Sequence, residues 1–209
     1  MTRIKICGIT NYDDAVLAIE SGADALGFIG VPDSPRYVSP HDAQNIVKRL
    51  PPFTTTVAVV RRAADASVYP CDHIQYYTGG PLENVHCYKA IRVRNARDLQ
   101  QISAEHRNSS AILLDTFHED LLGGSGQTFD WALALQAKSF TNAAIILAGG
   151  LNQDNVTEAC TTVHPYAVDI ASGTESSPGR KDRFKVMEFV QAVRAFDFER
   201  DRIVNLPIR

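Results

Sequence analysis

Two side chains capable of proton transfer follow apolar segments that are far apart in the chain. Cys7 closes the alternating segment RIKIC (residues 3–7), and Asp115 follows the apolar pair Leu113 and Leu114. A thiolate can remove a proton and a carboxyl group can supply one when their pKa values suit the operating pH. The structural alternatives are a small buried cysteine and an aspartate that orients a loop, since both occur widely in proteins.

Further residues have the chemistry to bind an anion. Arg36 lies in the segment SPRY (34–37), and an arginine there can hold a carboxylate or a phosphate through two hydrogen bonds. Glycine turns on one rim of a fold can present backbone N–H groups to a phosphate. A single glycine cluster is explained by a tight turn, but several on consecutive units favour a phosphate site. These glycine turns comprise Gly124 and Gly126 within 123–126, the pair Gly149 and Gly150, and Ser172 with Gly173.

Strand-like and helix-like segments alternate along the chain and would position these residues. Strands are expected at residues 3–7, 25–29, 55–60, 73–77, 87–93, 111–114, 144–148 and 167–170. Helices are expected over 10–22, 39–50, 95–105, 130–137, 154–162 and 183–196, with Thr10 and Ser39 as caps of the first two.

Eight such units in 209 residues predict one α/β domain over residues 1–209, a (β/α)8 TIM barrel near the lower size limit of that fold. The alternative is an open doubly wound sheet, which usually has fewer strands and its glycine fingerprint after the first strand. In a barrel the carboxyl ends of the strands share one rim, so Cys7 and Asp115 would both face the same site.

Composition narrows the classes of function. The net charge is −3 and basic residues form no long run, so we expect no nucleic-acid partner. The first strand begins within three residues of Met1 and the apolar runs are short, so we expect neither a signal peptide nor a membrane span. Four widely spaced cysteines and six histidines without ligand spacing predict reduced thiols, a cytoplasmic protein and no metal site.

The chain resembles the phosphoribosylanthranilate isomerase family of tryptophan biosynthesis. The resemblance runs in order from about residue 3 to 195, and the ordered set of motifs is far more specific than any one of them. The matching motifs are KICGIT (5–10), SGADALGF (21–28), SPRYVSP (34–40), LLD (113–115), GGSGQTFDW (123–131), LAGGLN (147–152), AVDIASG (167–173) and PGRKD (178–182).

The resemblance implies an aldose–ketose isomerase that needs neither a metal nor a redox cofactor. Its reaction is the Amadori rearrangement of N-(5′-phosphoribosyl)anthranilate to 1-(2-carboxyphenylamino)-1-deoxyribulose 5-phosphate. By motif, Cys7 would be the general base, Asp115 the general acid and Arg36 the residue that holds the anthranilate carboxylate. The glycine turns would take the phosphate, and Asp169 would have a supporting role. We expect a monomer or a homodimer.

Two segments depart from the family pattern. QYYT (75–78) replaces the usual Gln-Leu-His-Gly, so Tyr77 stands in place of a histidine and Thr78 in place of a glycine. AVVR (58–61) replaces Val-Phe-Val-Asn, and few residues separate the third, fourth and fifth strands. We therefore expect shortened helices around units three and four of the barrel.

Other functions remain open from the sequence. One is a different phosphosugar barrel, such as a metal-dependent epimerase, an indole-forming synthase or an aminoaldose isomerase of histidine synthesis. These would favour metal ligands at strand ends, a matching partner for Lys89, or an aspartate in place of Cys7, respectively. The other is a non-catalytic or altered-substrate phosphosugar-binding barrel, which the rebuilt side suggests and the presence of both Cys7 and Asp115 argues against.

Overall fold

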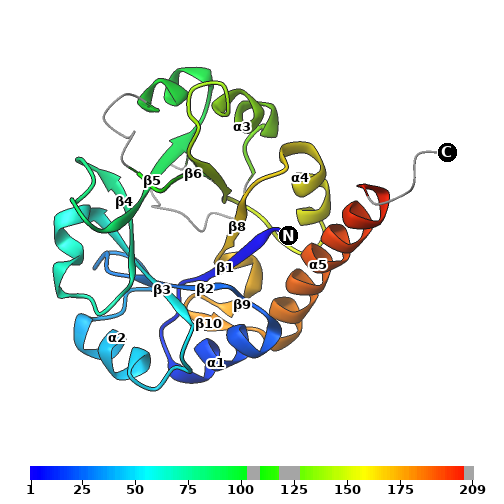
Figure 1. The fold of residues 1–209 in the computed structure, drawn as a ribbon. Coiled ribbons are helices and arrows are strands. Elements are labelled where there is room, and N and C mark those ends of the chain that lie inside the picture. The colour runs from blue at the N-terminus through cyan, green and yellow to red at the C-terminus, as the bar shows by residue number, and fades with distance from the viewer. Residues whose placement is uncertain (103–108, 118–127, 205–209) are drawn as a thin grey trace.

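Eight parallel strands close into a barrel in chain order, which confirms the predicted fold class (Figure 1). The computed structural model describes residues 1–102, 109–117 and 128–204. The strands are β1 (Arg3–Cys7), β2 (Ala25–Ile29), β3 (Thr55–Arg62), β4 (His73–Thr78), β5 (His86–Val93), β6 (Ala111–Thr116), β7 (Ala144–Leu147) and β8 (Ala167–Ile170).

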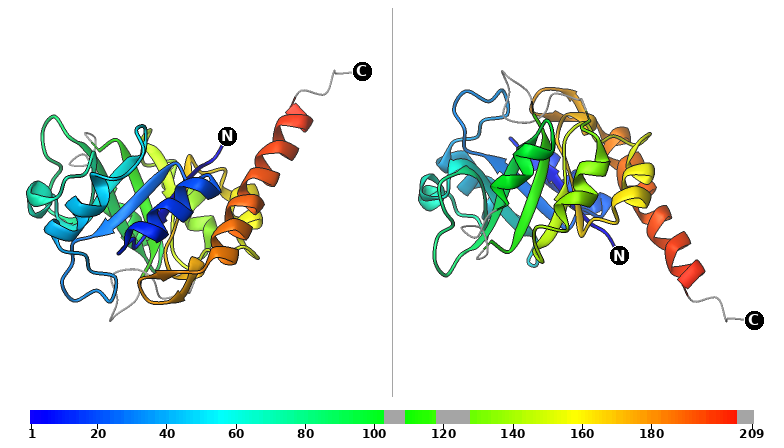
Figure 2. Two further views of the ribbon diagram at one scale, coloured as in Figure 1. Left: turned by 90° about the horizontal axis from the view of Figure 1, so that it is seen from below. Right: turned by 90° about the horizontal axis from the view of Figure 1, so that it is seen from above.

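Five α-helices surround the barrel in the described part of the chain (Figure 1). The last of them continues past the end of the barrel (Figure 2). None of the described helices is both long and apolar enough to cross a membrane. The helices are α1 (Tyr12–Ser21), α2 (Pro40–Val47), α3 (Trp131–Ala137), α4 (Val156–Val163) and α5 (Arg183–Val204).

Side-chain caps fix where the first two helices begin. Ser39 caps α2 as predicted, since its side chain accepts a hydrogen bond from the backbone N–H of Asp42. The predicted Thr10 cap of α1 is wrong. Asn11 has the extended backbone of a cap and accepts from Asp14 N–H, whereas the Thr10 hydroxyl donates to the carbonyl of Gly179 at 2.6 Å.

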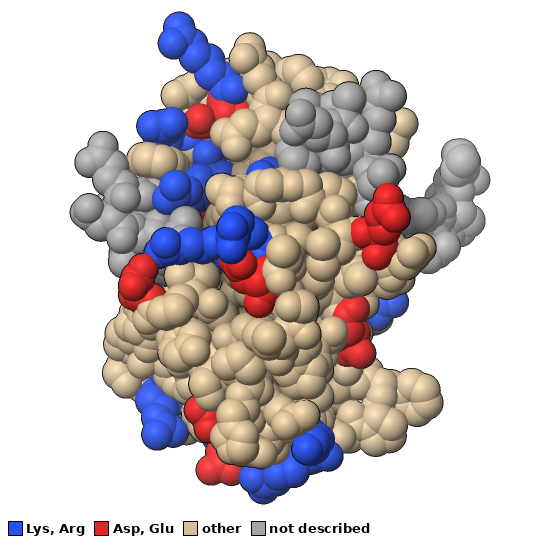
Figure 3. Space-filling view, turned by 90° about the vertical axis from the view of Figure 1, so that its left-hand side faces the viewer, with Lys and Arg blue, Asp and Glu red and all other residues tan. Residues whose placement is uncertain are grey.

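The outer layer is thin around units three and four, as the sequence predicts. The 3-10 helix η1 (Ala63–Val68) joins β3 to β4, and residues 79–85, all within the described chain, contain no helix before β5. On this side of the molecule, Lys and Arg side chains lie beside Asp and Glu side chains and uncharged areas (Figure 3).

The α-helix expected over residues 95–105 is instead a short 3-10 helix, η2 (Ala96–Gln101), in the part that the structure describes. Asp98 accepts hydrogen bonds from the backbone N–H groups of Arg94 and Asn95, and Asn95 accepts from that of Arg97. Such local side-chain bonds compete with the α-helical ladder and favour a tight turn.

The main hydrophobic core lies between the strands and the surrounding helices. Successive side chains of a strand point to opposite faces, so Ile4 and Ile6 of β1 join this core whereas Lys5 and Cys7 face the barrel interior. The core between the strands and the helices therefore explains why Ile4 and Ile6 are the apolar residues of the alternating segment RIKIC. Its polar half lies inside the barrel, where a charge is buried.

A short hairpin after β8 brings two more charged residues to the carboxyl end of the barrel. The 3-10 helix η4 (Ser172–Thr174) precedes the hairpin, which is formed by the antiparallel strands β9 (Glu175–Ser177) and β10 (Arg180–Lys181). The two charged residues are Glu175 and Lys181. The hairpin contacts the first unit, because the backbone N–H of Lys181 donates to Asp14 of α1 at 3.0 Å.

Candidate active site

A hollow at the carboxyl ends of the strands brings together most of the residues that the sequence singles out. Gly173, which follows Ser172, is not among the residues that line this hollow, and Gly124 and Gly126 lie outside the described residues. Gln75 and Tyr77 also line the hollow. The predicted residues among its lining are Cys7, Arg36, Asp115, Gly149, Gly150, Asp169 and Ser172.

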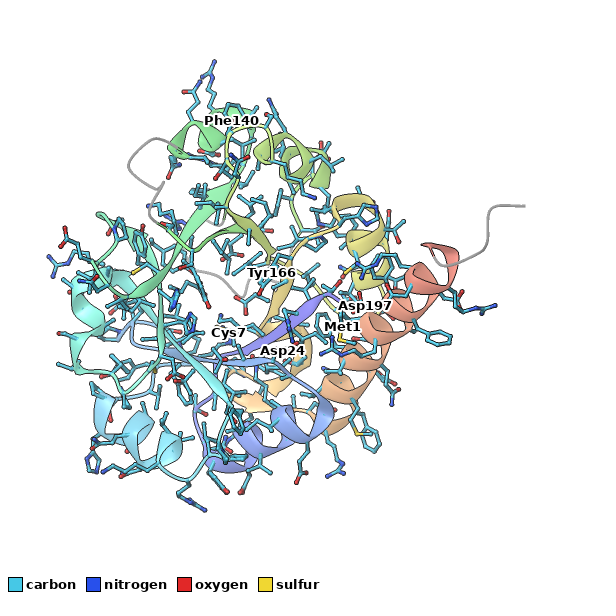
Figure 4. The ribbon with its side chains drawn as sticks, in the orientation of Figure 1. Met1, Cys7, Asp24, Phe140, Tyr166 and Asp197 are labelled. Atoms are coloured by element: carbon cyan, nitrogen blue, oxygen red, sulfur yellow. The ribbon has the colours of Figure 1, made fainter. Side chains whose placement is uncertain are left out.

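Cys7 reaches the hollow from the end of β1, on the inner side of the barrel (Figure 4). Gly27 of β2 is its register partner and provides the space for the thiol. A Cβ atom on Gly27 would lie 2.7 Å from Cys7 Sγ and 3.1 Å from Lys5 Nζ. Burial raises the pKa of the Cys7 thiol, and the nearby Lys5 ammonium opposes this rise.

Asp115 is buried at the end of β6. Burial raises the pKa of its carboxyl group to about 7, and the Asp169 carboxylate contributes to the same rise. A carboxyl group with this pKa retains its proton in a large fraction of molecules near neutral pH. Asp115 thus has the property that a general acid requires.

A buried ion pair joins β1 to β8 beneath the hollow. Lys5 Nζ lies 2.9 Å from Asp169 Oδ1 and donates a second hydrogen bond to Gln75 Oε1, also at 2.9 Å. The attraction to Asp169 and Cys7 outweighs the effect of burial, so the pKa of Lys5 is raised and the ammonium keeps its charge. The sequence analysis missed Lys5, although a lysine two residues before Cys7 in a strand of a closed barrel must share its inner face.

Arg36 is held by the hairpin that follows β8. Its Nε and Nη2 atoms donate to the Glu175 carboxylate at 2.8–3.1 Å. Lys181 Nζ lies 3.2 Å from the same carboxylate, and burial lowers the pKa of this lysine against the opposing effect of Glu175. Glu175 therefore fixes the plane of the guanidinium that borders the hollow.

The loops after β7 and β8 require glycine for two different reasons. Gly149 and Gly150 have φ values of +84° and +65°, a conformation that L side chains rarely adopt. A Cβ atom on Gly173 would overlap the carbonyl oxygen of Leu151, so this glycine lets the two loops pack together. The close approach of Gly173 to Leu151 places the loops after β7 and β8 side by side.

Tyr77, which the resemblance places where the family usually has histidine, lies near the end of β4. It is half-buried, lines the hollow, and its carbonyl accepts a hydrogen bond from Lys89 Nζ at 2.6 Å. Burial, followed by the negative charge of Asp115, raises the pKa of its phenol well above 10. Tyr77 is therefore a neutral hydrogen-bonding group in the site.

The fold and the site define a class of protein, the (β/α)8-barrel enzymes, whose active sites lie at the carboxyl ends of the strands, where Cys7 and Asp115 line the hollow. A family model described as N-(5′-phosphoribosyl)anthranilate (PRA) isomerase matches residues 4–192, and the chain belongs to this family. The isomerase of Geobacter metallireducens is 43% identical over 206 residues, which cover 93% of this chain and 100% of the relative.

Solved structures of the family superpose on the barrel. Phosphoribosylanthranilate isomerase of Thermotoga maritima has a TM-score of 0.83 and 38% identity, covering 93% of this chain and 100% of that one. An isomerase complex with reduced 1-(o-carboxyphenylamino)-1-deoxyribulose 5-phosphate has a TM-score of 0.79 and 37% identity over the same shares. Monomers derived from the dimeric Thermotoga maritima enzyme have a TM-score of 0.80, 36% identity and the same coverage.

Proposed function

We propose that this chain catalyses the Amadori rearrangement of N-(5′-phosphoribosyl)anthranilate in tryptophan biosynthesis, as a cytoplasmic monomer or homodimer. Membership of the isomerase family supports the proposal. The structural observation that carries it is that Cys7 and Asp115 line the same hollow. The product is 1-(2-carboxyphenylamino)-1-deoxyribulose 5-phosphate, so the reaction moves hydrogen within one molecule and requires no external oxidant or reductant.

In the first step Asp115 gives its proton to the ring oxygen of the ribose. The bond between C1′ and this oxygen breaks, and the lone pair of the anthranilate nitrogen forms a protonated Schiff base with C1′. The pKa of about 7 keeps the required proton on Asp115 near neutral pH. Because Asp115 is buried, the transfer takes place away from bulk water.

In the second step the Cys7 thiolate removes the proton from C2′. The electrons of the C2′–H bond form a C1′=C2′ double bond, and the electrons of the C=N bond return to the nitrogen. The resulting enolamine then tautomerises: the Cys7 thiol gives a proton to C1′ and the Asp115 carboxylate takes the hydroxyl proton at C2′, so both groups return to their starting forms. The ketone is formed with all atoms and electrons conserved.

The remaining residues hold the substrate. Arg36, fixed by Glu175, would bind the anthranilate carboxylate, because a guanidinium matches a carboxylate in charge and geometry. The phosphate would lie on the loops of Gly149, Gly150, Ser172 and Gly173, together with Gly124 and Gly126. Asp169 would have a supporting role, as the ion-pair partner of Lys5.

An assay with substrate generated in place tests the proposal. The purified chain should remove the fluorescence of N-(5′-phosphoribosyl)anthranilate and form the aminoketose, and its gene should restore growth to a tryptophan auxotroph that lacks this isomerase. A chain that binds inorganic phosphate at the rim but neither turns over the substrate nor restores growth would instead be an altered-substrate phosphosugar-binding barrel.

A further inference from the structure

The Lys5–Asp169 ion pair is buried inside the barrel. Lys5 and Asp169 are register partners on β1 and β8, and their side chains are only 4% and 7% exposed. Removing two charges from water costs several kcal/mol for each ion, and apolar residues in the same place are often as stabilising. A buried pair beneath a reaction site thus points to a role beyond folding.

The pair is oriented with respect to the two proton-transfer groups. Lys5 Nζ and Cys7 Sγ both lie next to Gly27. A Cβ atom on Gly27 would be 3.1 Å from Lys5 Nζ and 2.7 Å from Cys7 Sγ. Asp169 lines the hollow with Asp115, and Gln75 holds the Lys5 ammonium from the side of β4. The ammonium of the pair therefore lies near the Cys7 thiol, and its carboxylate shares the hollow with the carboxyl group of Asp115.

The orientation determines the balance of charge effects at each group. At Cys7, Lys5 lowers the pKa more than Asp169 raises it. At Asp115 the order is reversed, since Asp169 raises the pKa more than Lys5 lowers it. The pair thus acts in opposite directions on the two groups.

Other groups face the same two side chains. Lys181 of β10 also lowers the pKa of Cys7, and Arg92 of β5 lowers that of Asp115 by less than Asp169 raises it. Tyr77 of β4 faces both groups with a neutral phenol. None of Lys181, Arg92 and Tyr77 reverses the effect of the ion pair on the pKa of Cys7 or of Asp115.

We propose that Lys5 and Asp169 are positioning residues that increase the share of molecules in the reactive form, with Cys7 as the thiolate and Asp115 protonated. The Lys5 ammonium favours the thiolate form of Cys7, and the Asp169 carboxylate favours the protonated form of Asp115. Burial alone would keep both groups protonated. The inference rests on the proposed function, because it presumes that the reaction needs the base deprotonated and the acid protonated at the same time.

The proposal predicts separate pH effects for the two partners. With the pKa of Asp115 below that of Cys7, the reactive form is a minor fraction whose share is constant between the two pKa values. Lys5→Met raises the Cys7 pKa, so the plateau of kcat/KM falls and its alkaline edge moves to higher pH. Asp169→Asn lowers the Asp115 pKa, so the plateau falls and its acidic edge moves to lower pH.

The thiol can be titrated without reference to turnover. The rate of Cys7 alkylation by iodoacetamide, followed by peptide mass spectrometry between pH 6 and 11, gives the thiol pKa in each variant. Lys5→Met should raise it by about 1–3 units, the range for a lost neighbouring charge. Lys5→Arg, which keeps the charge, should stay within about one unit of the unmodified protein.

A failure of this inference and a failure of the proposed function give different experimental results. An unchanged Cys7 titration in a folded Lys5→Met variant overturns the inference, whatever the activity. Absence of turnover by the unmodified chain overturns the proposed function instead, and full turnover by Cys7→Ala removes Cys7 from its role as base. If Lys5→Met does not fold, Asp169→Asn decides: a plateau whose acidic edge stays at the pH of the unmodified enzyme overturns the inference, and a shift to lower pH supports it.

Discussion

At the scale of single residues, burial affects the two proton-transfer groups differently. For Asp115 it produces a carboxyl group with a pKa of about 7, which is useful for an acid at neutral pH. For Cys7 it disfavours the thiolate that a base requires. The neighbourhood of Cys7 must offset that effect, and Gly27 matters because it allows Lys5 and Cys7 to share one space.

A methyl group at Gly27 tests this packing. Gly27→Ala places a carbon 2.7 Å from Cys7 Sγ, so the thiol or the Lys5 ammonium must move. We expect a folded protein whose kcat/KM is lower by about 10²-fold, since small displacements of a reacting group can cost this much. Steady-state kinetics and thermal unfolding would measure both properties.

The matched control is Gly80→Ala, because a Cβ atom on Gly80 meets no heavy atom within 4 Å. This variant should retain the kinetics of the unmodified enzyme. Equal kcat/KM values for Gly27→Ala and Gly80→Ala would show that the close packing at Gly27 has no part in the reaction.

The sequence singles out Cys7, Asp115 and Arg36 because each has a distinctive residue type at a strand end or in a motif. It does not identify their partners. Lys5 bonds to Asp169 across 164 positions of the chain, and Arg36 bonds to Glu175 across 139. Pairings of this range depend on barrel closure and on the path of the β9–β10 hairpin, and no local pattern contains that information.

At the scale of elements, the loops after β7 and β8 and the hairpin form the rim around the hollow.

The prediction of strands and of most helices follows from alternation and capping residues. The type of η2 does not, because competing side-chain bonds of Asn95 and Asp98 decide it. The thin units three and four are predictable from the short spacing between strands, which leaves no room for full helices.

A substitution at Gly150 tests the rim as a phosphate site. Gly150→Ala must keep a φ of +65°, a conformation that costs an L residue roughly 1–2 kcal/mol, or else distort the loop. We expect KM to rise by about tenfold or more with a smaller change in kcat, and inorganic phosphate to inhibit less strongly.

Inhibition by inorganic phosphate in the unmodified enzyme is the reference for this comparison. It should be competitive with the substrate, because both anions would use the same backbone N–H groups. A sulfate-soaked crystal with the anion bound consistently away from Gly150 and Gly173 would contradict the assigned site.

At the scale of the whole molecule, the barrel is unevenly supported. Buried residues of β3, β4 and η1, including Val60, Ile74 and Tyr76, form a small core cluster separate from the main one. Val68, Leu82 and Val85 on the same side are exposed. Cys7, Arg36 and Asp115 belong to units one, two and six, away from this side.

We therefore expect residues 61–86 to be the least stable part of the barrel wall. Hydrogen–deuterium exchange should show faster exchange there than in residues 111–114 of β6, since local stability follows apolar burial. Equal protection of both segments in a protein that light scattering shows to be monomeric would refute the prediction. A dimer that covers this side would account for equal protection.

The role of Cys7 and Asp115 as base and acid is tested most directly by the turnover of Cys7→Ala and Asp115→Asn. Each variant removes the proton-transfer group and leaves Arg36 and the glycine loops in place. We expect each variant to fold and to bind inorganic phosphate. The kcat of each should fall by at least about 10²–10⁴-fold. A kcat near that of the unmodified enzyme in either variant would contradict the role of that residue, and a change confined to KM would assign it to substrate binding.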